Sequence, residues 1–114
     1  MDLSDWRERI DKLDLKLLDL LNERASFVFQ LIPLKRQKAI PVEEPEREAA
    51  VRANVNRHNR GPLSDEALGR IFDAIMEEMK AVQRDELRSE KRRPRREPPT
   101  ARSAPKRSSR ADVK

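Results

Sequence analysis

The stretch that decides the fold runs from Leu3 to Gln37, LSDWRERIDKLDLKLLDLLNERASFVFQLIPLKRQ. Its apolar residues recur mostly at steps of three and four, the period of an α-helix; they are Leu3, Trp6, Ile10, Leu13, Leu17, Leu20, Leu21, Val28, Leu31 and Leu34. Ser4 is the expected N-cap. Pro33 predicts a kink or an early fray of the helix, because its ring removes the hydrogen bond to the carbonyl of Phe29.

Two shorter helices are predicted downstream. One begins at Glu44-Pro45, since proline suits the first helical position, and ends near Asn59. The Gly61-Pro62 turn separates it from the other helix. That last helix is capped by Ser64 and continues to about Leu87 or a little beyond. The sequence therefore predicts an all-α fold of three helices, the first much longer than the others.

The length of the first helix predicts self-association. A helix of roughly 35 residues is about 50 Å long, and the two shorter helices cannot cover its apolar stripe. We expect the long helix to pair with a second copy. The alternative is a monomeric three-helix bundle in which the first helix breaks at Pro33.

Charge divides the chain into two parts. Residues 88–114 hold eleven Lys and Arg against three acids, so their net charge is +8, and the total of +5 leaves −3 for residues 1–87. We predict a helical domain over residues 1–90 and a disordered basic tail over residues 91–114, which is too poor in apolar residues to fold. The tail has no aromatic residue for base stacking, so nucleic-acid binding is the less favoured interpretation and a solubilising tail the more favoured.

Composition excludes several classes of chemistry. With no cysteine and one histidine, a disulfide scaffold, a thiol nucleophile and a Cys-ligated zinc site are ruled out, and we expect no metal or cofactor. The longest uncharged run, Ala25 to Leu34, is too short to span a membrane. The acidic N-terminus is not a signal peptide, so a cytoplasmic location is predicted.

A few charged and polar residues fall on the apolar faces. Arg24 and Lys35 share one face of the first helix, three turns and about 16 Å apart. Glu48 shares a face with valines in the second helix, and Gln83 shares one with Met79 in the third. Buried charges need partners, so this grouping predicts an anion site. The alternative is that Arg24 and Lys35 extend from the edge of the stripe into solvent.

Arg7 lies too far along the first helix to join that site. It precedes Arg24 by 17 residues, which is about 25 Å along the axis. In an antiparallel pairing it would reach the partner's site. The alternative is a surface arginine paired with Asp11.

Four blocks of sequence, in order and at matching spacing, resemble the AroQ-type, all-helical chorismate mutases. They are Trp6–Arg24, Lys35 with Ile40–Glu48, Asn59–Ser64, and Arg70–Gln83. The resemblance covers about residues 3–84. It implies an intertwined helical homodimer with two sites, each taking one arginine from the other protomer. It also implies conversion of chorismate to prephenate in Phe and Tyr biosynthesis.

The resemblance assigns roles to individual residues. Arg7 of the partner and Arg24 would bind the two carboxylates of chorismate. Lys35 would contact a carboxylate and the ether oxygen, and Gln83 would donate to that oxygen from the opposite side.

The remaining assigned positions lie on the second and third helices. Glu48 would accept from the ring hydroxyl, while Glu44 and Arg47 would hold that end of the substrate. Met79 stands where the family often has a small polar residue, so one substrate contact would be lost. Pro33 is a second departure from the family pattern.

Two other functions stay open. An isochorismate pyruvate-lyase would share the fold, but the acid at Glu48 favours a mutase. A non-catalytic helical dimer would act as a binding or regulatory module. A protein partner that regulates activity is a further prediction.

Overall fold

The computed structural model describes residues 1–92, and the side chains of residues 1–89. That region of the chain consists of three helices without a strand: α1 (Leu3–Gln37), α2 (Pro45–His58) and α3 (Asp65–Arg92). The predicted all-α class and the order of one long and two shorter helices are confirmed. The predicted disorder of the basic tail falls almost wholly on residues 93–114, outside the described residues.

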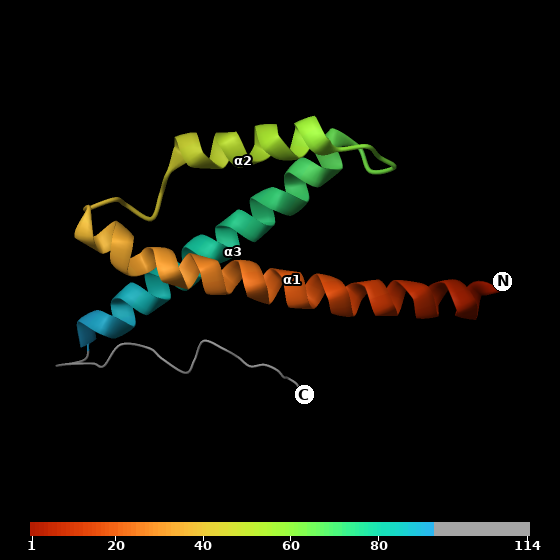
Figure 1. Ribbon diagram of the computed structural model, residues 1–114, viewed down its shortest axis with the longest axis horizontal. Helices are drawn as coiled ribbons and strands as arrows, with labels where there is room; N and C mark the ends of the chain where they lie inside the picture. The colour runs from red at the N-terminus through yellow and green to blue at the C-terminus, as the bar shows by residue number, and fades with distance from the viewer. Residues whose placement is uncertain (93–114) are drawn as a thin grey trace.

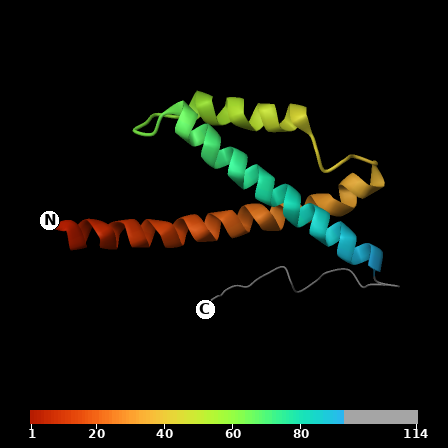
Figure 2. The same ribbon diagram turned by 180° about the vertical axis from the view of Figure 1, so that it is seen from behind.

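Helix α3 is the element that packs against both others (Figure 1). It crosses α1 near the C-terminal end of α1, and α2 runs back beside the N-terminal half of α3 (Figures 1 and 2). The core lies at the crossing, where Val28 and Ile32 of α1 and Met76 and Met79 of α3 are buried. Polar side chains that surround this crossing are therefore held by the best-packed region of the chain.

The N-terminus of α1 differs from the prediction. Asp2, not Ser4, is the N-cap: its carboxylate accepts from the backbone N–H of Asp5 at 3.0 Å. The Asp5 carboxylate accepts from the N–H of Asp2 at 3.1 Å, which completes a capping box. The reciprocal pair satisfies two orphan donors where Ser4 alone would satisfy one, so the helix begins at Leu3.

Of the two outcomes predicted for Pro33, the kink and the early fray, the structure shows the kink. The helix continues to Gln37. Its last turns bend away from the axis of the preceding turns in both views (Figures 1 and 2), as a mid-helix proline predicts. Lys35 stays on helical backbone and keeps its expected face.

The other boundaries follow the sequence closely. Glu44 occupies the cap position of α2 and Pro45 its first turn. Ser64 caps α3 by accepting from the N–H of Ala67 at 3.0 Å. Between them, Gly61 takes a left-handed φ of 74°, which favours glycine, and its N–H donates to the Asn59 side chain at 2.9 Å. Helix α3 extends to Arg92, beyond the predicted end near Leu87.

The N-terminal half of α1 projects from the rest of the chain (Figure 1). Six residues of the predicted stripe are each more than half exposed: Leu3, Trp6, Ile10, Leu13, Leu17 and Leu20. A bundle closed on a broken first helix is therefore not what the chain forms. No helix among the described residues has the length and apolar character to cross a membrane.

The packing at the crossing makes a stability prediction. Ile32 is 3% exposed, so Ile32→Ala should lower the free energy of unfolding by about 2–5 kcal/mol, through lost burial and the cavity left behind. Ile32→Val is the matched control and should cost about 0.5–1.5 kcal/mol. Urea denaturation followed by circular dichroism measures both. Equal, small losses for the two variants would contradict the crossing as the core.

Candidate active site

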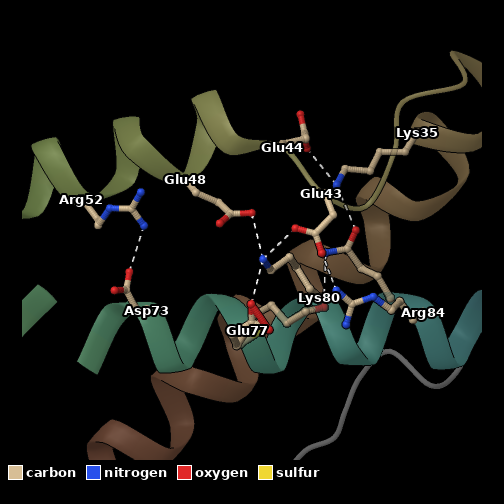
Figure 3. Close-up of polar contacts among 11 residues, drawn as sticks. Lys35, Glu43, Glu44, Glu48, Arg52, Asp73, Glu77, Lys80 and Arg84 are labelled. Atoms are coloured by element: carbon tan, nitrogen blue, oxygen red, sulfur yellow. Dashed lines mark hydrogen bonds and ion pairs between the residues drawn. The ribbon is translucent and has the colours of Figure 1, made fainter. Parts of the chain in front are cut away.

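Lys35 lies where α1, the 38–44 loop and α3 meet (Figure 3). Its Nζ donates to Gln83 Oε1 at 3.0 Å and lies 2.8 Å from Glu44 Oε1. The side chain is 14% exposed. An ammonium has three N–H donors, and two of them are used here. The third has no partner among the described side chains of residues 1–89, so it is available to a ligand.

Gln83 is the buried member of this pair, at 6% exposure. Its Oε1 accepts from Lys35, and its Nε2 donates to the carbonyl oxygen of Met79 at 3.3 Å, one turn back on α3. The carboxamide has two N–H donors, and the second has no acceptor among the described residues. Lys35 and Gln83, joined by this hydrogen bond, thus each keep one N–H donor that no described residue uses.

Arg24 of α1 and Arg47 of α2 form a second positive group. Burial lowers the pKa of the Arg24 guanidinium, and the nearby charge of Arg47 lowers it further. Neither arginine makes an ion pair with an acid among the described side chains of residues 1–89. Two guanidiniums that disfavour each other and lack a carboxylate partner are a site for a bound anion.

Glu48 lies on α2 and points toward α3, with its side chain 21% exposed (Figure 3). Its Oε2 lies 3.1 Å from Nζ of Lys80, a buried lysine of α3. Lys80 also contacts Glu43 Oε1 at 3.0 Å and Glu77 Oε2 at 2.9 Å (Figure 3). These acids raise the pKa of Lys80, with the hydrogen bond to Glu77 as the largest cause.

Three residues of this cluster were missed by sequence reasoning: Glu43, Glu77 and Lys80. Arg84 of α3 pairs with Glu43 and so helps hold the loop onto the helix. A signal for Lys80 was present, since it follows Met76 by four residues and precedes Gln83 by three, on the same helical face. Nothing local marks Glu43, because its partners are some 40 residues away.

Of the eight predicted site residues, the structure places seven around the crossing of α1 and α3 and the facing end of α2; they are Arg24, Lys35, Glu44, Arg47, Glu48, Met79 and Gln83. Arg7 is the exception. It lies on the projecting half of α1, fully 28 residues before Lys35, or roughly 40 Å along the helix. It cannot belong to the site of its own protomer.

The arrangement suits a small molecule that carries two negative charges and a weakly basic oxygen. The arginine pair offers planar forks for carboxylates. Lys35 and Gln83 are hydrogen-bonded to each other and each has one unused N–H donor, a kind of group that stabilises charge on an oxygen. The partly buried setting strengthens these interactions relative to water.

Comparison with known proteins agrees with this arrangement. Residues 6–84 match the family model described as chorismate mutase type II. The chain is 34% identical over 86 residues to the chorismate mutase of Methanocaldococcus jannaschii, covering 75% of this chain and 87% of that one. It is 44% identical over 82 residues to a bifunctional chorismate mutase/prephenate dehydratase of Neisseria gonorrhoeae, but spans only 22% of that protein's length.

The fold has a solved counterpart as well. The structure of chorismate mutase (form II) from Thermus thermophilus superposes with a TM-score of 0.70 at 26% identity, covering 72% of this chain and 93% of that one. With a family match across most of the chain, a relative matched over nearly its whole length and the helical fold in common, the chain belongs to the chorismate mutase type II family.

Proposed function

We propose that the protein converts chorismate to prephenate by a one-step intramolecular rearrangement. The observation that carries this is the Lys35–Gln83 pair at 3.0 Å, with one unused N–H on each member. The reaction breaks an ether C–O bond and forms a C–C bond within one molecule. It needs no nucleophile, general base or metal, only a fixed substrate conformation and stabilised charge.

The two N–H donors act on the ether oxygen. Negative charge grows on this oxygen as the C–O bond breaks, so donors already aimed at it favour the transition state over the ground state. Lys35 brings a full charge, and Gln83 a neutral amide held on α3. Glu44 keeps the Lys35 ammonium in position through the 2.8 Å ion pair.

The other residues hold the flexible dianion in its compact reactive conformation. Arg24 and Arg47 bind carboxylate, and Glu48 accepts from the ring hydroxyl. Restricting the substrate in this way removes entropy before the chemical step. Met79 offers no hydrogen-bond donor where a small polar side chain would. We expect this lost substrate contact to raise KM more than it lowers kcat.

The site is completed by Arg7 of a second copy. The uncovered stripe on the N-terminal half of α1 supports this, because six large apolar side chains in water are unfavourable and a second α1 of the same pattern would cover them. A symmetric, antiparallel pairing exchanges the two Arg7 side chains between the two sites.

The first prediction concerns the donors. Lys35→Ala and Gln83→Ala should each lower kcat/KM for prephenate formation by at least about 10²-fold, the size of losing one preorganised donor. Lys38→Ala, an exposed lysine at the end of α1, is the matched control and should stay within about threefold of wild type. A loss below threefold for either donor variant would contradict the assignment. Release of pyruvate from isochorismate, without prephenate from chorismate, would favour the lyase.

The second prediction concerns the shared site. Arg7→Ala and Lys35→Ala should each be nearly inactive alone. After equal mixing and subunit exchange they should recover about a quarter of wild-type activity, because about half the dimers are mixed and each mixed dimer holds one intact site. Sedimentation of the mixture confirms the dimer and its exchange. Exchange without any recovery would show that Arg7 does not serve the partner's site.

A further inference from the structure

We infer that Lys80 is a positioning residue of the active site: its ammonium holds the Glu48 carboxylate by one oxygen and leaves the other oxygen for a substrate hydroxyl. This inference rests on the proposed function. It concerns a residue that lies beside the reacting groups without touching substrate itself.

The donor count at Lys80 supports an indirect role. Its three carboxylate partners, Glu77, Glu43 and Glu48, lie at 2.9, 3.0 and 3.1 Å from Nζ. An ammonium has three N–H donors, so all are used. Lys80 therefore has no donor left for a ligand and can act on one only through its partners.

Glu48 is the partner through which Lys80 acts. Only Oε2 of Glu48 is engaged, and its other oxygen has no partner among the described side chains of residues 1–89. Glu43 and Glu77 are more than half exposed, whereas the Glu48 side chain is 21% exposed. The three partners come from the 38–44 loop, α2 and α3, so the ammonium fixes Glu48 relative to all of them (Figure 3).

The neighbouring arginines explain why Glu48 needs to be held. Arg47 is adjacent to Glu48 in the chain, and Arg24 is close enough for its pKa to be lowered by the charge of Arg47. A carboxylate released in this region would be drawn to those guanidiniums. It would then occupy the place of a substrate carboxylate. By pairing with Glu48, Lys80 keeps the arginine pair open.

A buried lysine also calls for a specific reason. Lys80 is 8% exposed and stands on the face that carries Met76 and Gln83. Burying an ammonium is unfavourable unless it is paired and hydrogen-bonded. An apolar residue here would pack without that requirement, so the lysine is explained by what it does to Glu48.

Steady-state kinetics test the inference with Lys80→Met. We expect KM for chorismate to rise at least tenfold while kcat changes less than threefold, since the ether-oxygen donors Lys35 and Gln83 remain in place. In a Glu48→Gln background, Lys80→Met should change KM less than threefold, because the group it positions is gone. A full, additive loss in that background would overturn the inference, as would a KM within threefold of wild type for Lys80→Met alone.

Arg84→Met is the matched control. Arg84 pairs with Glu43, as Lys80 does, but has no contact with Glu48. This variant should keep KM and kcat within about threefold of wild type. If Arg84→Met raised KM as much as Lys80→Met, the effect would come from holding the loop, and the inference would be overturned. Circular dichroism of each variant checks that the helices are intact.

A measurement that needs no turnover separates this inference from the proposed function. The ammonium protons of Lys80 in the full chain should exchange with water at least tenfold more slowly than those of Lys12, whose side chain is 74% exposed. Their nitrogen-15 resonance should shift in Glu48→Gln. Exchange as fast as at Lys12 would overturn the inference even in an active enzyme. Slow exchange in a protein that makes no prephenate would reject the proposed function and leave the Lys80–Glu48 pair standing.

Discussion

The structure depends on one constraint: α1 is longer than the rest of the protomer can cover. A 35-residue helix presents an apolar stripe along its whole length, but only its C-terminal region meets α3. Val28 and Ile32 are buried there, whereas Leu3 to Leu20 stay in the open. The polar side chains of the site, among them Lys35, Gln83 and Glu44, are therefore gathered at the crossing. Residues on the projecting half of α1, such as Arg7, lie too far along the helix to reach that site.

Charge balance at the crossing follows from this crowding. Arg24, Lys35 and Arg47 would repel one another unless acids or a ligand offset them, and Glu44 offsets the charge of Lys35 through their 2.8 Å ion pair. Too much compensation would cancel the attraction for a dianion. The lysine at position 80 takes up the charge of Glu48, so the arginines lack acid partners among the described residues while the acid remains nearby.

Much of the fold was predictable because its signals are local. The three- and four-residue spacing, Pro45, Gly61 and Ser64 fix the helices and their ends within a few residues of the chain. The errors were also local competitions. Asp2 rather than Ser4 is the N-cap, because the Asp5 carboxylate accepts a hydrogen bond from the backbone of Asp2 in return. Helix α1 bends at Pro33 instead of ending there, because the turns on either side pack against α3 and continue the helix.

The site was only partly predictable, and the reason is physical. Arg24, Lys35 and Gln83 were identified because each is a polar residue on an otherwise apolar face, a contrast visible in a single helix. Glu43 stands in a loop, and its meaning comes entirely from Lys80 and Arg84 on another element. Lys80 had the right periodicity, but periodicity cannot tell whether a lysine ends in solvent or among three carboxylates. Only the packing of α3 against α2 and the 38–44 loop decides this. That packing brings three carboxylates to Lys80 and places a residue type that is usually exposed beside the site.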